Sequence, residues 1–481
     1  MNLSINKEQV LRSCLLVLGF LEKAYVFLFK PKKTALYNGR FMSRLERMEI
    51  LSEQNKGTVV NGKYSLSLDA SYKHTLLIGI TGSGKSTTVY VPMIQKCKHS
   101  MVILDLSGSL FDMTSADLKK RGFRVKRVNF SDPLNSEGYN PLARADTPSK
   151  MKKLAAQIVD TGMGSSGSKD PFWNLSSKQV LYTIIRILKE SADEKYHNLS
   201  SVRYLLNNLS HNPESPGNKW LINNAPSEEV YAELMGALGG TEKTIGAVLA
   251  NTRACLELIA DPNLARLVAT DTLGDLGKIR QGKPVALFLS VQETDVKYLS
   301  FLMSMLLQDL FSVAMNMPGK KDKPLFFLLD EAGHFPLPSF SAILTTLRKR
   351  QVGCIISIQS KSQLTHQYGA ADAESIMMGG VATTIFLPGQ PSCKNNQELS
   401  NLLGDKTVII NGQQVRKALL TPDEIFRLKG QAILLHAGHR PALLKQYPFY
   451  KNPTLLKRTQ LRPLSYKRRT LPPVEVLPLD V

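Results

Sequence analysis

Short apolar runs alternate with amphipathic stretches along most of this chain, from about residue 57 onward. Each run is too short for a helix and is apolar on both faces, which is typical of a strand buried inside a parallel sheet. The runs are Leu76–Ile78, Val102–Leu104, Val285–Leu289, Leu325–Leu329, Ile355–Ile358 and Ile385–Leu387. The pattern predicts an α/β fold with helices on both faces of a mainly parallel sheet.

One long interval, 174–281, does not follow this rhythm. Apolar residues recur at helical spacing from Val180 to Leu188, and two further helices are expected to begin at Ser227 and Thr241. We therefore expect an all-α domain inserted into the α/β domain.

The charge balance points to a polyanionic partner. Lys and Arg total 61 against 40 Asp and Glu, which gives a formal net charge of +21. A balance this basic fits nucleic acid or an anionic membrane surface. The five cysteines contain no Cys-x-x-Cys pair, which excludes a disulfide scaffold and a cysteine-based zinc module and suits a reducing cytosol.

The N-terminal region holds the only candidate targeting segment. Its apolar run, 14–21, is interrupted by Glu22 and Lys23 and continues over 25–29, before a basic flank at Lys30, Lys32 and Lys33. It lacks the small-residue cleavage site of a signal peptide. Three structures are compatible with it: a buried helix, an interfacial anchor and a membrane-spanning helix. We expect no apolar run long enough to cross a bilayer elsewhere in the chain.

The strongest chemical signal is the sequence Gly-Ile-Thr-Gly-Ser-Gly-Lys-Ser at 79–86. It matches the phosphate-binding pattern G-x-x-x-x-G-K-[ST], with an expected strand before it and a helix after it that Pro92 limits or kinks. Glycines let successive backbone N–H groups converge on phosphate oxygens. The predicted nucleotide-binding residues are Gly79, Thr81, Gly82, Ser83, Gly84, Lys85, Ser86 and Thr87.

Two of these residues have specific expected roles. Lys85 is predicted to reach the β- and γ-phosphates of ATP, and the Ser86 hydroxyl is predicted to bind Mg²⁺. The motif thus predicts a P-loop NTP hydrolase.

An acidic pair supplies the second signal. Asp330 and Glu331 follow the apolar run Leu325–Leu329, and ligands bind at the carboxyl ends of parallel strands. Asp330 is predicted to hold Mg²⁺, and Glu331 to orient or deprotonate the attacking water. Such pairs are common after buried strands, so the prediction depends on the phosphate loop.

Two further residues are weaker candidates. Gln359 ends the next expected strand and is predicted to contact the γ-phosphate, the alternative being an ordinary polar strand end. Arg350 closes the basic run Arg348–Arg350 and is the candidate arginine finger toward a neighbouring subunit's ATP; a solvated helix end is the alternative. His436 and His439 have no evident third ligand, so we predict no metal site there.

These patterns divide the chain into five segments. They are an N-terminal membrane-proximal segment (1–50), the first part of a nucleotide-binding domain (51–173), the inserted all-α domain (174–281), the second part of the nucleotide-binding domain (282–450) and a basic tail (451–481). The tail holds seven basic and two acidic residues and two adjacent prolines, and we expect it to be mobile.

The motifs together resemble those of the type IV secretion coupling proteins, the TraG-like conjugative DNA-transfer ATPases. The resemblance covers about residues 37–450, and the motifs come in the family's order. They are residues 79–86, Ser100–Gly108, Tyr139–Leu142, Asp170–Trp173, Leu328–Ala332, Ile358–Leu364, Leu420–Ile425 and His436–Pro441.

The resemblance implies a RecA-like motor domain with an inserted all-α domain, assembled as a hexamer at the cytoplasmic face of the bacterial inner membrane. It implies that ATP drives the passage of a relaxase–DNA complex to a secretion channel. The nucleotide-site residues of the family match Lys85, Ser86, Asp330, Glu331 and Gln359 by position.

The chain departs from the family's pattern at two places. After Asp105 it has Leu106–Ser109 where the family usually has Pro-Lys-Gly-Glu, so a lysine and a glutamate near the motor are missing. Many members begin with two membrane-spanning helices, whereas only the interrupted stretch 14–29 is present here. Membrane attachment is therefore expected to be peripheral, through a single anchor, or supplied by a separate protein.

We predict an ATP-driven coupling protein that delivers relaxase-bound single-stranded DNA to a transfer channel, with ATP and Mg²⁺ as cofactors. One rival function is a double-stranded DNA translocase of the chromosome-partitioning type, which usually carries a C-terminal winged-helix module that the short tail cannot contain. The other is a nucleotide-binding docking receptor that does not hydrolyse ATP.

Overall fold

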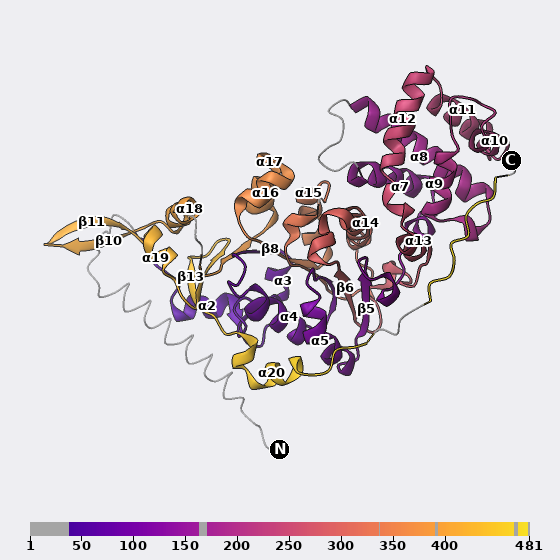
Figure 1. Ribbon diagram of the computed structural model, residues 1–481. Helices are drawn as coiled ribbons and strands as arrows, with labels where there is room; N and C mark the ends of the chain where they lie inside the picture. Colours follow the sequence, from indigo (N-terminus) through magenta and orange to yellow (C-terminus); the bar gives the residue numbers. More distant parts are fainter. Residues whose placement is uncertain (1–37, 163–170, 336, 390–392, 466–469, 480–481) are drawn as a thin grey trace. The chain divides into compact units, whose positions relative to one another are not determined.

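The computed structural model describes residues 38–162, 171–335, 337–389, 393–465 and 470–479 (Figure 1). The chain forms two compact units, each built from several stretches of sequence. The first comprises the chain up to Lys98, Gly353–Gln363 and Glu374–Lys457. The second comprises His99–Val352, Leu364–Ala373 and the residues from Arg458 onward. The candidate targeting segment, 14–29, lies outside the described residues.

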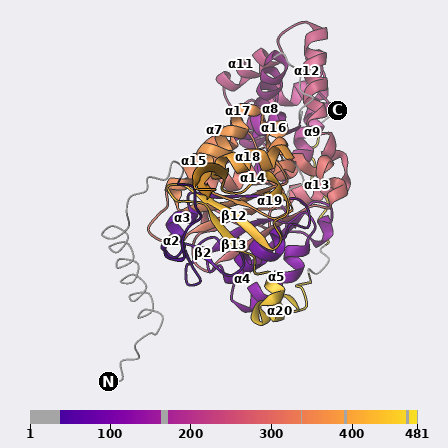
Figure 2. The same cartoon turned by 90° about the vertical axis from the view of Figure 1, so that its left-hand side faces the viewer.

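The first unit is built on a mixed sheet. Its strands lie in the order β13 (Ala442–Lys445), β12 (Gln431–His436), β9 (Thr383–Phe386), β3 (Thr75–Ile78) and β8 (Val352–Ile358). β3 runs parallel to β8 and β9, whereas β12 is antiparallel to β9 and β13. Figure 2 views this unit from the side of β12 and β13.

The second unit contains a wholly parallel set of strands. Their order is β7 (Leu325–Leu329), β4 (Ser100–Leu104), β6 (Val285–Ser290) and β5 (Arg124–Asn129). Every residue of β7, β4 and β6 is buried, which is why each reads as an apolar run. β5 is the edge strand and is partly exposed, so its alternating sequence gave no such signal. All six predicted runs lie on strands, and the predicted α/β class is confirmed.

Short helices and two small hairpins complete the first unit. They are α2 (Arg44–Ile50), α3 (Leu68–Ser71), α4 (Val91–Lys96), α18 (Cys393–Leu403), α19 (Pro422–Phe426), the pair β1 (Leu51–Ser52) and β2 (Ser65–Leu66), and the pair β10 (Asp405–Ile410) and β11 (Gln413–Ala418). α20 (Pro453–Thr459) lies against α4, where the Gln95 side chain donates to the Leu455 carbonyl at 3.3 Å (Figure 2).

The described chain between β5 and β6 is helical. Its helices are α6 (Pro141–Arg144), α7 (Pro148–Gly162), α8 (Pro171–Ser191), α9 (Leu199–Asn207), α10 (Pro216–Asn223), α11 (Glu228–Ala237), α12 (Glu242–Ala254) and α13 (Pro262–Ala269). α8 is the central helix and packs against α7, α9, α11 and α12 (Figure 1). The expected helix starts are confirmed, because the side chains of Ser227 and Thr241 cap α11 and α12.

Helical structure begins before the predicted boundary at residue 174. α7 is amphipathic, with Leu154, Ile158 and Val159 buried, and it packs against α8 and α14 (Val296–Ala314). The domain boundaries themselves stay predictions.

α14 corrects one expectation. The segment Glu293–Ala314 is long and apolar enough, by length and composition, to cross a membrane, although we expected no such run after the N-terminal region. In the most apolar 18-residue window of this segment, 61% is buried. Phe311 stacks on Phe327 of β7 with ring centroids 4.4 Å apart. A mostly buried position of this kind is typical of a core helix.

The remaining helices of the second unit are α5 (Ser109–Lys120), α15 (Phe340–Leu347) and α17 (Ala370–Glu374); α16 (Lys361–Tyr368) starts in the first unit.

The expectation of a mobile tail was wrong for the part that is described. The Leu464 N–H donates to Ser115 Oγ at 3.2 Å, and the Leu477 N–H donates to Ser201 Oγ at 3.2 Å. Leu477 is only 4% exposed, and Leu471 and Leu479 are buried as well. The reason is that apolar residues after the last basic residue of the tail are buried within the second unit, which the count of charges did not reveal.

Candidate nucleotide site

The predicted phosphate loop leaves the carboxyl end of β3 as a tight turn. Gly82 and Gly84 have φ values of 79° and 98°, a left-handed conformation that residues with a side chain rarely adopt. A Cβ placed on Gly79 would lie 2.5 Å from Ser83 Oγ. The backbone path therefore favours glycine at 82 and 84, and the packing of the Ser83 side chain favours glycine at 79.

Lys85 closes this loop. It is 7% exposed, and its Nζ donates to the carbonyl of Gly79 at 2.9 Å. Ser83 Oγ is buried and has no hydrogen-bond partner among the described residues. A buried hydroxyl without a partner, in a loop that also holds the Lys85 cation, suits an anionic oxygen, so the residues present fit a phosphate group.

The helix after the loop begins with an irregular turn. Ser86–Tyr90 forms a π-helical turn in which the Val91 N–H reaches the Ser86 carbonyl, and α4 follows without a break. Pro92 has no N–H to give to the preceding turn, which accounts for the widening there. The helix is not ended by Pro92, since α4 continues to Lys96, and the kink stays a prediction. Thr88 steadies the turn by donating from Oγ1 to the Gly84 carbonyl at 2.7 Å.

The other loop residues are accessible. Thr81 is exposed, Ser86 and Thr87 are partly exposed, and Thr87 Oγ1 donates to the Gly84 carbonyl at 3.3 Å. The predicted magnesium ligand Ser86 is thus a partly exposed residue at the start of the helix.

Gln359 lies beside the loop. β3 and β8 pair in a register that places Ile78 opposite Ile358, and the Gly79 N–H donates to the Ile358 carbonyl at 3.1 Å. Gln359 therefore follows its strand at the level where the loop begins. It is partly exposed, and its backbone N–H donates to Gln363 Oε1 at 3.0 Å. Its contact with a γ-phosphate stays a prediction.

The acidic pair ends β7 in the second unit. Asp330 and Glu331 are partly exposed after five fully buried residues. Glu331 has a φ of 59°, which is unfavourable for a residue with a side chain and is concentrated at functional sites. The phosphate loop belongs to the first unit, so the approach of these carboxylates to the same nucleotide stays a prediction.

A third carboxylate lies next to this pair. Leu104 of β4 pairs with Leu329 of β7, so Asp105 and Asp330 follow neighbouring strands at the same level. Asp105 is 2% exposed. Burial raises the pKa of its carboxyl to about 6, and the negative charge of Asp330 acts in the same direction.

The loop after Asp105 is a helix cap. The Asp105 carboxylate accepts the N–H of Leu110 at 3.2 Å and that of Phe111 at 2.7 Å, at the start of α5. Gly108 precedes the helix with a φ of 74°, and a Cβ on it would lie 3.1 Å from Arg127 Nη2. The loop that lacks the family's lysine and glutamate thus keeps an ordered structure.

Arg127 was missed by the sequence analysis. It comes from the edge strand β5, its guanidinium lies 4.8 Å from the centre of the Phe111 ring, and its Nε donates to Ser290 Oγ at 3.3 Å. Its positive charge opposes the upward shift of the Asp105 pKa. The only sequence feature that could have indicated Arg127 is the alternation of apolar and polar residues along β5, and this pattern is too short to be distinctive.

Replacing Asp105 with asparagine should change how stability depends on pH. Because the folded-state pKa is raised from 3.8 to about 6, the carboxylate is disfavoured in the folded protein. The stability contributed by the protonated form is full below pH 4 and is lost as the pH rises through 6. We expect the wild type to lose roughly 2 kcal/mol relative to Asp105→Asn between pH 4 and pH 7.

Urea denaturation at several pH values measures this difference. Asp112 is exposed on α5, the helix that Asp105 caps, and provides the matched control. The stability of Asp112→Asn should depend on pH as that of the wild type does. Parallel profiles for the wild type and Asp105→Asn would show that the buried carboxyl does not titrate in this range.

Arg350 makes contacts within its own chain. Its Nε donates to the Met315 carbonyl at 2.8 Å, at the end of α14, and its Nη1 contacts Met317 Sδ. Arg350 is partly buried, whereas Arg348 and Lys349 of the same run are exposed. The arginine-finger role of Arg350 stays a prediction. Arg348 and Lys349 are more exposed than Arg350, so they are at least as accessible to a neighbouring subunit.

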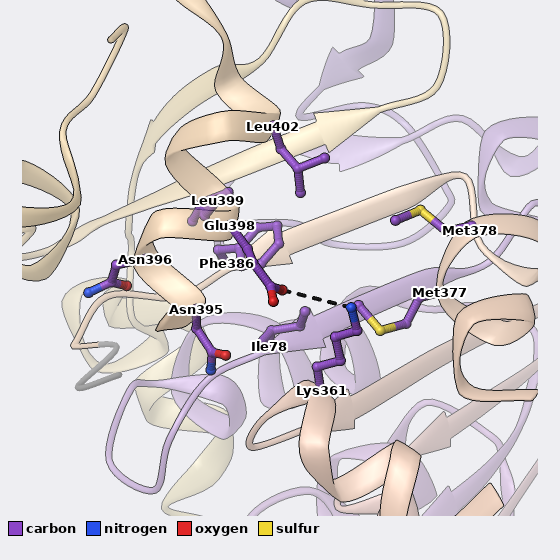
Figure 3. Close-up of a pocket in the computed structure, with 10 residues that line it drawn as sticks. All are labelled: Ile78, Lys361, Met377, Met378, Phe386, Asn395, Asn396, Glu398, Leu399 and Leu402. Atoms are coloured by element: carbon purple, nitrogen blue, oxygen red, sulfur yellow. Dashed lines mark ion pairs between the residues drawn. The ribbon is translucent and has the colours of Figure 1, made fainter. Parts of the chain in front are cut away.

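A pocket opens where β3 and β9 end (Figure 3). Ile78, the residue directly before the phosphate loop, forms part of its wall, and Lys361 and Glu398 pair across it at 3.8 Å. The other lining residues are Met377, Met378, Phe386, Asn395, Asn396, Leu399 and Leu402. This mostly apolar lining suits a flat ring better than a phosphate. Its residues come from separate elements, so no motif predicted it.

Comparison with known proteins agrees with this picture. The family described as "Type IV secretory system Conjugative DNA transfer" matches residues 40–470. The VirD4 protein of Rhizobium radiobacter is 24% identical over 420 residues, which cover 79% of this chain and 58% of the relative. A conjugal transfer protein TraG of Escherichia coli is 24% identical over 452 residues, covering 81% of this chain and 69% of the relative. The chain thus spans less than two thirds of the length of the VirD4 relative.

Solved structures of the plasmid coupling protein TrwB have a similar fold. TrwB in complex with ADP and Mg²⁺ gives a TM-score of 0.65 at 18% identity, covering 93% of this chain and 98% of its own. TrwB with a non-hydrolysable ATP analogue also gives 0.65, at 19% identity over 87% and 95% of the two chains. The predicted RecA-like α/β fold is confirmed. With the family matching most of its length, this chain belongs to the type IV secretory system conjugative DNA transfer family.

Proposed function

We propose that this protein is an ATP-driven coupling protein of a conjugative type IV secretion system. It recruits a complex of relaxase and single-stranded DNA and delivers it to the transfer channel. The observation that carries the proposal is the phosphate loop, in which buried Lys85 donates to the Gly79 carbonyl and Gly82 and Gly84 are left-handed, in a chain of the conjugative DNA transfer family.

The proposed nucleotide is ATP with Mg²⁺. The loop amides and Lys85 would bind its phosphates, and Ser86 and Asp330 would hold the metal ion. Bound Mg²⁺–ATP supplies a phosphoanhydride bond whose hydrolysis can drive movement. Glu331 would orient a water molecule and accept its proton, because a carboxylate is a suitable base for that step. The ligands of the TrwB structures, ADP with Mg²⁺ and an ATP analogue, support this assignment.

Gln359 and the basic run would connect the nucleotide to movement. Gln359 lies beside the phosphate loop, where its amide would detect the γ-phosphate. A cation of the run Arg348–Arg350 would act on the ATP of a neighbouring subunit in a homo-hexamer. The net charge of +21 suits a strand of DNA threaded through such a ring.

The proposed location is the cytoplasmic face of the bacterial inner membrane. The apolar stretch 14–29 with its basic flank supports attachment there, either at the surface or through one span. The partners are the relaxase, single-stranded DNA, the channel proteins and further copies of this chain.

ATP hydrolysis by the purified full chain tests the proposal. The rate is measured without DNA, with single-stranded DNA and with duplex DNA, each at two protein concentrations. Stimulation by single strands that rises more than in proportion to protein would support both the substrate and the oligomer.

Two outcomes would replace the proposal. Stimulation by duplex DNA alone would favour a double-stranded DNA translocase. Binding of ATP with no turnover under any condition would favour a docking receptor that uses nucleotide only for assembly.

A further inference from the structure

The hairpin of β10 and β11 extends away from α18 and α19 (Figure 1). It forms a two-stranded sheet of its own, paired from Asp405↔Ala418 to Ile410↔Gln413. Asn411 and Gly412 connect the strands with φ values of 51° and 80°, the conformation of a tight hairpin turn. The hairpin is thus an ordered projection.

The tip of this hairpin is apolar and accessible. Ile409 is 65% exposed, Ile410 is 53% exposed and Val415 is 40% exposed. Successive residues of a strand point to opposite faces, so Ile409 and Ile410 present apolar surface on both sides of the ribbon. A single protein surface would cover one face only, whereas a lipid layer surrounds an inserted tip on both.

The base of the hairpin carries positive charge. Lys406, Arg416 and Lys417 lie farther from the turn than the isoleucines. Asp405 is the only acidic residue of the two strands, and Arg416 pairs with it at 2.5 Å. An apolar tip above a cationic base matches the order of acyl chains and anionic headgroups in a membrane interface.

The N-terminal segment joins the structure at the same place. Asn38 forms an antiparallel bridge with Lys406, and the Gly39 N–H donates to the Asp405 carbonyl at 2.7 Å. A Cβ on Gly39 would lie 2.3 Å from that carbonyl oxygen, so the close approach requires glycine. The Met42 N–H donates to the Pro441 carbonyl at 2.8 Å and fixes the chain beyond it.

The sequence before this junction has the composition of a membrane contact. It contains the apolar stretch 14–29 and then Lys30, Lys32 and Lys33, a few residues before Asn38. A segment of that composition therefore reaches the folded chain at the base of a hairpin with an apolar tip.

We propose that the tip of the β10–β11 hairpin inserts into the interface of an anionic lipid bilayer, as a membrane contact additional to the N-terminal segment. The inference rests on the membrane location proposed above and is independent of ATP hydrolysis. Two contacts with the membrane would set the orientation of the first unit there, which one point of attachment does not do.

Flotation with vesicles measures the contribution of the tip. The full chain is compared with Ile409→Glu/Ile410→Glu on vesicles of phosphatidylcholine with phosphatidylglycerol. We expect the double variant to bind at least roughly tenfold more weakly, because it exchanges apolar insertion for charge. Tyr231→Glu on α11, where the tyrosine is 43% exposed, is the matched control and should bind as the wild type does. Equal binding of the double variant and the wild type would overturn the proposal.

A measurement of insertion depth distinguishes membrane contact through the hairpin from membrane contact through the N-terminal segment. In Ile410→Trp, brominated lipids should quench fluorescence beyond the quenching of the wild type. A variant that floats with vesicles while its added tryptophan is not quenched would overturn the proposal and leave the membrane location intact. Failure of the wild type to float would reject the membrane location as well. If the double glutamate variant instead loses self-association in the absence of lipid and the tryptophan is not quenched, the hairpin is a contact between copies of this chain.

Discussion

Replacing Lys85 with alanine should abolish ATP hydrolysis and, with it, DNA transfer. The Nζ of Lys85 donates to the Gly79 carbonyl, so its charge lies at the start of the predicted phosphate loop. Removing a positioned charge from such a site typically lowers the rate by ~10²-fold or more. We expect the loss to include nucleotide affinity, because the same charge faces the bound phosphates in the ground state.

Fluorescent ATP-analogue binding and steady-state hydrolysis measure the two effects separately. Lys96→Ala is the matched control, since Lys96 also donates to backbone carbonyls, those of Gly62 and Lys63, each at 3.0 Å. The control should lower stability and leave turnover per folded molecule near the wild-type value. Wild-type turnover in Lys85→Ala would remove the assignment of the phosphate loop.

Replacing Glu331 with glutamine should separate binding from hydrolysis. The amide cannot accept a proton from water, so turnover should fall by ~10²–10⁴-fold while ATP still binds. The variant should therefore retain ATP rather than ADP after mixing. Rapid filtration followed by chromatography of the bound nucleotide shows which one is present.

The backbone at Glu331 offers a control for conformational effects. Its φ of 59° is unfavourable for Glu and Gln alike, so the substitution preserves the local strain. Glu331→Gly would relieve that strain and should stabilise the fold by about 1 kcal/mol while it also stops hydrolysis. If Glu331→Gln hydrolyses ATP at the wild-type rate, another residue activates the water.

Local patterns predicted much of the fold because the strands are buried on both faces. Leu325–Leu329 is fully buried and reads as an uninterrupted apolar run. β5 was not predicted, because a partly exposed strand mixes apolar and polar residues over only a few positions. The mobile-tail prediction failed for a related reason, since Leu477 packs onto a surface that is far away in sequence.

The candidate site likewise has one part that the sequence could predict and another that it could not. The phosphate loop could be predicted because its eight residues are contiguous and the chemistry of phosphate binding restricts each fixed position. Arg127 and the pocket beside Ile78 could not, because their residues come from elements that are separated along the chain.

The sequence by itself determined the local chemistry of this protein: which stretches form buried strands, where phosphate can be bound, and which acidic pair follows a strand. Tertiary structure alone decided which of these groups become neighbours. The placement of Asp105 beside Asp330 follows from the pairing of β4 with β7, and the attachment of Gly39 to Asp405 places an apolar hairpin at the entry of the N-terminal segment. The physical reason is that strand pairing and close backbone approach depend on packing across the whole unit, whereas a motif depends only on residues adjacent in the chain.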